Sequence, residues 1–150
     1  MTRPPAHDDL ADPTSLLGTW QLTRVIEDRR LDDVSHLDGS LELASEGPDL
    51  VTWEERATWH RPAGDVAVRR GLRLQRTGDG WWVRFEDGRD FHPWRPGEQV
   101  EHDCTPDLYR GTVRGTTDRW TVVWEASGPE KDYRMTTTLT PGTAGGVSPS

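Results

Sequence analysis

Apolar and polar side chains alternate with a period of two residues along most of the chain. In the segment 16–28, Trp20, Leu22 and Ile26 fall on one face and mostly polar residues fall on the other. The same period continues in the segments 40–45, 50–59, 66–75, 81–87, 98–104, 107–113, 119–126 and 131–139. Alternation of this kind is typical of β-strands that bury one face.

Short turn sequences separate these segments, as expected for an antiparallel meander: Asp38-Gly39, Gly47-Pro48, Gly78-Asp79-Gly80, Asp87-Gly88, Pro96-Gly97 and Gly128-Pro129. A helix of one or two turns is compatible with the pattern only at 31–39. About eight to ten short strands with tight turns favour an all-β, antiparallel up-and-down barrel, because closure removes exposed strand edges. A β-sandwich is the alternative. Such a barrel can enclose a cavity for one small ligand, open at one end.

Four charged residues fall on faces that are otherwise apolar: Arg24, Glu55, Arg70 and Lys131. Burying a charge is costly unless it is paired and hydrogen-bonded. One interpretation is an ion-pair network inside the barrel, with the longer side chains reaching its mouth. The other is a solvated pocket in which arginine binds a carboxylate or phosphate group.

The chain has 150 residues, enough for one domain. Both ends are poor in apolar residues, so we predict tails at 1–14 and 141–150 and one folded domain at 15–140. Eight tryptophans indicate an aromatic core. The net charge of -8 argues against nucleic acid as a partner, because a phosphate backbone requires a basic surface.

The single cysteine, Cys104, excludes an internal disulfide. We recognise no signal peptide and no apolar run of about 20 residues that would span a bilayer. These features predict a cytoplasmic protein without a membrane partner. A homodimer is left open.

The segment 83–111 combines several residue types that carry chemistry. His102 and Cys104 are two positions apart, so both project from one face of a strand, and Asp107 and Tyr109 follow after a short turn. Four interpretations compete. Cys104 is a nucleophile activated by a histidine; His92, His102, Cys104 and Asp107 bind a metal ion; the thiol and imidazoles are structural; or the group performs acid–base work or ligand recognition.

Several segments resemble a known family. The opening Gly18-Thr19-Trp20 resembles the first strand of lipocalins and other calycin barrels. The series VRFEDGRDFH, HDCTPDLYRG and SGPEKDY resembles an uncharacterised family of small lipocalin-like domains of unknown function, over about residues 16–140. Its pattern reads GxWxLxRxIxD, FH, HxCxxDxYxG and GPxKDY. The resemblance implies a calycin-like barrel with shared pocket positions, and it implies no activity.

We therefore expect a barrel that binds a small organic molecule in a polar and aromatic interior. The expected ligand-binding residues are Arg24, Trp20, Glu55, Arg70, His92, Lys131 and Tyr133, and no cofactor or metal is expected. If the protein is an enzyme, the absence of a nucleotide-binding loop predicts a cofactor-independent isomerase, cyclase, dehydratase or hydrolase. The expected catalytic residues are then His102, Asp107, Tyr109 and Cys104. A haem- or metal-binding barrel that uses His92 or His102, or a protein-interaction module, are the alternatives.

Overall fold

A computed structural model describes residues 10–142, which form ten β-strands preceded by a short 3-10 helix, Pro13–Leu16. The strands are β1 (Gly18–Asp28), β2 (Asp33–Ser45), β3 (Leu50–His60), β4 (Val66–Thr77), β5 (Gly80–Phe85), β6 (Asp90–Pro93), β7 (Val100–Cys104), β8 (Asp107–Thr116), β9 (Arg119–Gly128) and β10 (Lys131–Pro141). Of the tails predicted at 1–14 and 141–150, residues 1–9 and 143–150 lie outside the described part of the chain.

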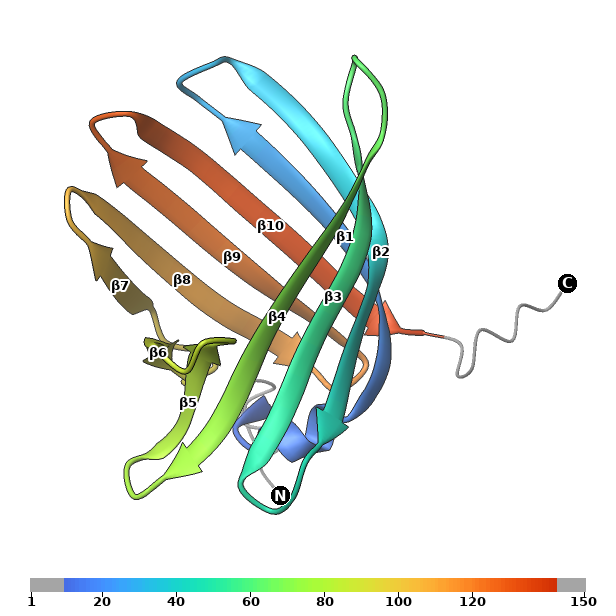
Figure 1. Ribbon diagram of the computed structural model, residues 1–150, viewed down its shortest axis with the longest axis vertical. Helices are drawn as coiled ribbons and strands as arrows, with labels where there is room; N and C mark the ends of the chain where they lie inside the picture. The colour runs from blue at the N-terminus through green and yellow to red at the C-terminus, as the bar shows by residue number, and fades with distance from the viewer. Residues whose placement is uncertain (1–9, 143–150) are drawn as a thin grey trace, which may run out of the picture.

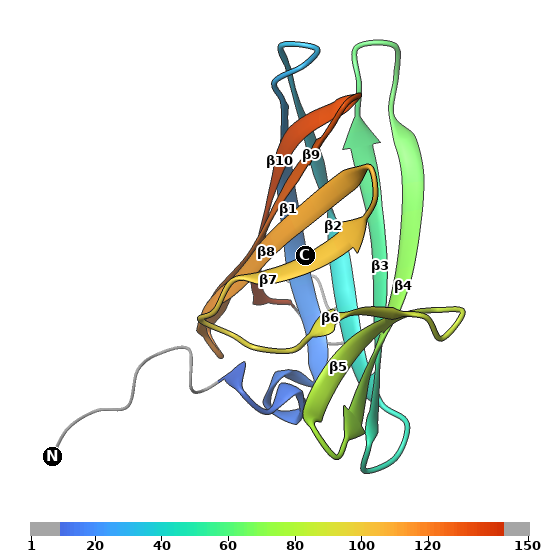
Figure 2. The ribbon, with the colours of Figure 1, turned by 90° about the vertical axis from the view of Figure 1, so that its left-hand side faces the viewer.

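The strands form one antiparallel sheet in the order β6-β5-β4-β3-β2-β1-β10-β9-β8-β7. Each strand pairs with the next strand in sequence, except that β6 does not pair with β7, and β1 also pairs with β10 over Trp20 to Asp28. The sheet therefore curls into a nearly closed up-and-down barrel (Figures 1 and 2). This is the fold class that the sequence predicts.

The backbone ladder is interrupted between β6 and β7, the two edge strands. Side chains bridge this gap. The ring of Phe91 on β6 contacts the ring of His102 on β7 at 5.1 Å between centroids. The His102 Nδ1 atom also donates to the backbone oxygen of Phe91 at 3.0 Å. An aromatic pair and one hydrogen bond thus link the edges that the ladder leaves unpaired.

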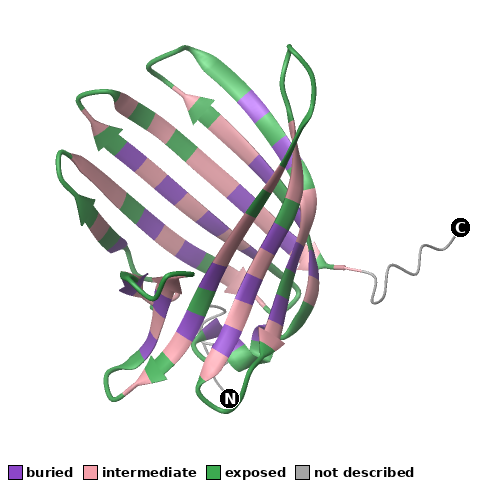
Figure 3. Cartoon of the chain, in the orientation of Figure 1, coloured by how far each residue is buried: buried purple, intermediate pink, exposed green. Residues whose placement is uncertain are grey.

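Buried and exposed positions alternate along the strands (Figure 3), as the two-residue period predicts. Trp120 lies at the centre of the aromatic core and is fully buried. It makes edge-on contacts with Trp20, Trp53 and Trp94 at 5.6, 5.8 and 6.3 Å between ring centroids. Edge-to-face packing is a favoured geometry for aromatic rings, so the tryptophans supply much of the packing that holds the barrel together.

The N-terminal segment covers one end of the barrel, the lower end in Figure 1. Leu10 and Leu16 are fully buried in the core. Their backbone oxygens accept hydrogen bonds from two indoles, Trp94 Nε1 and Trp20 Nε1, each at 2.8 Å. The structure thus differs from the predicted domain start at residue 15. Residues 10–14 belong to the fold because Leu10 and Pro13 cover apolar area that a barrel end would expose.

The prediction of a possible short helix at 31–39 is wrong, because β2 runs from Asp33 to Ser45. Ser35 and Leu37 are buried while Val34 and His36 are exposed, which is a strand pattern. Pairing with β1 on one side and β3 on the other satisfies the backbone of this segment. Within residues 10–142, no helix has the length and apolar character needed to cross a membrane.

Candidate functional site

A cavity of about 310 Å³ lies inside the barrel, toward the end opposite the 3-10 helix. This volume is in the range of small-molecule pockets. Strands β4 to β10, together with the β5–β6 turn, supply its lining, which consists of Arg70, Phe85, Arg89, Phe91, His102, Cys104, Tyr109, Trp124, Tyr133 and Met135.

Three stacked rings form the apolar wall of this cavity. Phe91 stacks on Phe85 with 4.6 Å between centroids, and on Trp124 with 5.0 Å. The interplanar angles are 16° and 14°. Met135 adds a flexible apolar side chain from β10. The ring or acyl chain of a ligand could pack against this flat apolar surface.

A buried ion-pair network lies beneath the cavity. Glu55 accepts hydrogen bonds from Arg24 Nη2 at 3.0 Å, Arg70 Nη2 at 3.0 Å and Trp53 Nε1 at 2.9 Å. Arg24 Nε donates to Thr137 Oγ1 at 2.7 Å. Burial acts to raise the pKa of Glu55, but the charges of Arg70 and Arg24 outweigh it and lower that pKa. Glu55 is therefore a carboxylate at neutral pH.

Arg70 is the member of this network that reaches the cavity. Its side chain is 36% exposed, whereas those of Arg24 and Glu55 are 9% and 4% exposed. Its buried Nε atom has no hydrogen-bond partner among the described residues. The network carries two positive charges and one negative charge. The donor without a partner therefore belongs to the arginine whose side chain lines the cavity.

Tyr109 and Tyr133 occupy the opposite wall with Lys131 at its edge. Lys131 Nζ donates to Tyr109 Oη at 2.8 Å and lies 3.2 Å from Asp107 Oδ2. These two hydrogen bonds raise the pKa of Lys131, so it is an ammonium group at neutral pH. Burial, followed by interaction with Tyr109, raises the pKa of Tyr133 to about 12. Tyr133 is thus a neutral donor near a fixed cation.

His102 and Cys104 line the cavity on β7, as their two-residue spacing predicts. Cys104 is exposed at the mouth. Asp107 does not join them, because it lies against Lys131. Among residues 10–142, no group of three or more His, Cys, Asp or Glu side chains is arranged to hold a metal ion.

Of the seven predicted ligand-binding residues, Arg70 and Tyr133 line the cavity. Arg24, Glu55 and Lys131 lie just behind its lining, and the remaining two lie in the core. Trp20 packs in the aromatic core near the covered end. His92 is buried against Phe91 and Trp124, and its Nδ1 atom donates to the Pro93 oxygen at 2.8 Å. Burial lowers the pKa of His92 to about 4, and the nearby imidazole of His102 and guanidinium of Arg70 lower it further. His92 is therefore a neutral core residue at physiological pH.

Five lining residues were not predicted as site residues: Phe85, Arg89, Phe91, Trp124 and Met135. Three of them fall on inward faces predicted from the sequence: Phe85, Trp124 and Met135. The alternation of apolar and polar residues could therefore have identified them as lining residues. Phe91 could not be found in this way, because β6 has four residues and its register with β5 shifts after Val83. A segment this short has no readable period.

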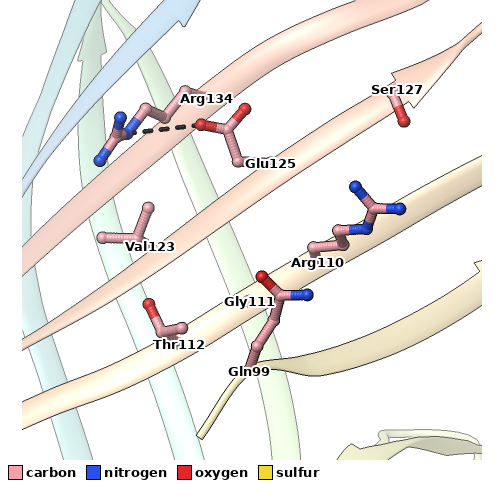
Figure 4. Close-up of a pocket in the computed structure, with 8 residues that line it drawn as sticks. All are labelled: Gln99, Arg110, Gly111, Thr112, Val123, Glu125, Ser127 and Arg134. Carbon is pink, nitrogen blue, oxygen red and sulfur yellow. Dashed lines mark ion pairs between the residues drawn. The ribbon is translucent and has the colours of Figure 1, made fainter. Parts of the chain in front are cut away.

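A second hollow, of about 330 Å³, lies on the outer surface of β8, β9 and β10 (Figure 4). Its lining alternates with the inward positions of these strands, so it is outside the barrel. Its arginines are already paired: Arg134 lies 3.6 Å from Glu125, and Arg110 lies 3.1 Å from Glu101. The charged side chains of this outer hollow are thus paired with each other or with neighbours, whereas the interior cavity is lined by an arginine with a donor that has no partner.

A family model described as "Family of unknown function (DUF6314)" matches residues 16–141. The chain belongs to the DUF6314 family. The match spans nearly the whole barrel, in agreement with the resemblance seen in the sequence to a family of unknown function. The GxWxLxRxIxD and HxCxxDxYxG pattern positions stay a prediction. No curated protein matches the chain by sequence.

Some solved structures are similar to this DUF6314 chain. The S-type phycobiliprotein lyase CPES from Guillardia theta matches with a TM-score of 0.58 and 8% identity, covering 85% of this chain and 89% of that one. A redesigned β-barrel, mFAP0, bound to DFHBI, matches with a TM-score of 0.45 and 17% identity, covering 84% and 98%. At such low identity, the lyase shows a shared barrel fold for this DUF6314 chain.

Proposed function

We propose that this barrel binds a small organic anion with a ring or an acyl portion, in the cavity lined by Arg70 and the stacked rings. The observation that carries the proposal is the state of Arg70. One nitrogen of its guanidinium is held by Glu55, its Nε atom has no partner, and its side chain reaches the cavity. A carboxylate is the group that best satisfies a planar cation with a free donor.

The charge balance supports an anion rather than a neutral ligand. Arg24, Glu55 and Arg70 together carry one excess positive charge next to a partly enclosed space. A charge held away from water is costly without a counter-charge. Glu55 also holds Arg70 in place by accepting a hydrogen bond from it at 3.0 Å, and Glu55 is itself held by a hydrogen bond from Arg24 at 3.0 Å. A preorganised guanidinium loses little freedom on binding, which favours affinity.

The apolar wall supports a ring or acyl group on the same ligand. A stacked aromatic surface is formed by Phe85, Phe91 and Trp124. The flexible side chain of Met135 can adapt to the shape of a ligand. The cytoplasmic location and the homodimer stay predictions that rest on the sequence.

The test is a titration of intrinsic tryptophan fluorescence with 3-phenylpropionate and with 3-phenylpropionamide. Trp124 lines the cavity, so a bound ligand should change its emission. We expect the carboxylate to bind and the amide to bind at least about 10-fold more weakly, since hydrogen bonds to charged groups contribute about 1.5–3 kcal/mol.

Arg70→Gln should weaken binding of the carboxylate about 10- to 100-fold. Arg73→Gln is the matched control, because Arg73 lies on the same strand and is exposed. It should leave the dissociation constant unchanged. Equal affinity for acid and amide, or an equal loss in the two variants while far-UV circular dichroism stays native, would refute the proposal.

A further inference from the structure

His102 and Tyr109 lie side by side on two adjacent strands, β7 and β8, in one wall of the cavity. They are direct register partners in the β7–β8 pair, with 6.2 Å between ring centroids. Both side chains line the cavity that Arg70 also lines. A ligand held at Arg70 would therefore lie against an imidazole and a phenol at the same time.

The hydrogen bond of His102 determines which of its ring nitrogens is basic. Nδ1 lies 3.0 Å from the backbone oxygen of Phe91, and a carbonyl oxygen can only accept. Nδ1 must therefore carry the hydrogen, which leaves Nε2 with its lone pair in the neutral ring. Nε2 has no partner among the described residues, so it is the atom available to accept a proton from a ligand.

The partner of Tyr109 determines what its hydroxyl can do. The ammonium of Lys131 has no lone pair, so it donates to Tyr109 Oη and takes no hydrogen from it. The phenol hydrogen is thus not used by Lys131. Lys131 is the only lysine of the chain, and Asp107 holds it at 3.2 Å. Its positive charge would stabilise negative charge that forms on the phenol oxygen.

We infer that His102 and Tyr109 are the base and acid of a proton-transfer site for a small carboxylic acid with a carbonyl group next to an acidic C–H bond. The inference rests on the proposed function, because Arg70 must first bind the carboxylate. It adds an activity, keto–enol interconversion or isomerisation, which needs no cofactor.

The step balances within the site. His102 Nε2 takes the proton of the C–H bond, and the electron pair of that bond forms a carbon–carbon double bond. The π electrons of the carbonyl move to its oxygen, which takes the hydroxyl proton of Tyr109. The resulting phenolate is stabilised by Lys131, and His102 becomes an imidazolium. Reversal of both transfers, at the same or another carbon, returns the site to its starting state.

Lys131 is a positioning residue, because it acts through Tyr109. Its raised pKa means that it is protonated and is not a nucleophile that would form a Schiff base. Asp107 was predicted as a catalytic residue, but it does not line the cavity. Its role here is to hold the ammonium group of Lys131 by an ion pair.

The experiment uses phenylpyruvate, which combines a ring, a carbonyl, an acidic C–H bond and a carboxylate. Exchange of its C3 hydrogens in D₂O is followed by proton NMR, and the dissociation constant by tryptophan fluorescence. We expect exchange above the buffer rate. Tyr109→Phe and His102→Gln should each lower the enzyme-dependent rate by about 100-fold or more, with the dissociation constant within a few fold of the original. His36→Gln, an exposed histidine on β2, is the control and should leave the rate unchanged.

Lys131→Met should lower kcat with little change in KM, and Lys131→Arg should restore part of the rate, because it keeps the charge. Binding of 3-phenylpropionate without any catalysed exchange of phenylpyruvate would overturn this inference and leave the proposed function intact. Failure of both probes to bind would overturn both. Full exchange in Tyr109→Phe or in His102→Gln would also overturn the assigned roles.

Discussion

The buried pair of Arg24 and Glu55 allows a quantitative prediction about stability. Their side chains are 9% and 4% exposed, and Glu55 accepts hydrogen bonds from three separate groups. Glu55→Gln keeps the size of the side chain and removes its charge. It also places an amide NH₂ group opposite guanidinium donors that need acceptors. Arg24 would then be a buried cation without a counter-charge.

The expected loss of unfolding free energy is about 3–5 kcal/mol, the range for removal of one partner of a buried ion pair. For a domain of this size each kcal/mol corresponds to roughly 2–4 °C in Tm. A loss of this size is a large part of the about 5–15 kcal/mol that stabilises a typical domain.

The assay is urea unfolding followed by tryptophan emission, at pH 7 and at pH 3. Glu54→Gln is the matched control, since Glu54 is next in sequence but contacts Arg56 and Arg69 on the outer surface. Glu54→Gln should lower the free energy of unfolding by about 0–1 kcal/mol. Adding Arg24→Met to Glu55→Gln should recover part of the loss, because it removes the uncompensated charge.

The pH dependence has a definite sign. The pKa of Glu55 is lowered in the folded state, so its contribution is present above its ordinary value of 4.5 and is lost as pH falls through the lower folded value. The difference between the wild type and Glu55→Gln should therefore shrink at pH 3. Equal costs for Glu55→Gln and Glu54→Gln at pH 7, or no recovery in the double variant, would refute this account.

Three further predictions concern the covered end, a close strand contact and a buried imidazole. Leu10→Ala should cost about 2–5 kcal/mol in urea unfolding, because Leu10 is fully buried, whereas Leu17→Ala, at a site 42% exposed, should change stability by less than about 0.5 kcal/mol. Gly39→Ala should reduce Tm more than Gly71→Ala, since the new Cβ meets backbone atoms of β3 at 2.1 and 2.5 Å in the first case and only a flexible glutamate in the second. Because the folded pKa of His92 is about 4 and its ordinary value is 6.5, the unfolded state binds more protons between these values, and stability should fall by up to roughly 3 kcal/mol as pH drops through them. His92→Phe should flatten that pH dependence, and an unchanged slope would contradict the assignment.

The sequence alone determined most of the strands and the direction of their side chains, but it missed β6 and the first part of β2. A period of two residues places Arg24, Glu55 and Arg70 on inward faces whatever the strands pair with, because alternate residues of a strand always point to opposite sides. The inward charge was therefore predictable, and so was the shared face of His102 and Cys104.

The tertiary structure decided which of these groups meet. Both His92 and His102 are histidines in short segments of the same region of the sequence. His92 lies on β6 and is buried in the core, whereas His102 lies on β7, pairs with Tyr109 and lines the cavity. Lys131 meets Tyr109 only because β8 and β10 flank β9. Leu10 is buried because the curled sheet creates an apolar end that needs covering. Strand direction is a local property of the backbone, whereas pairing, register and closure depend on contacts between residues far apart in the chain, which a local pattern does not encode.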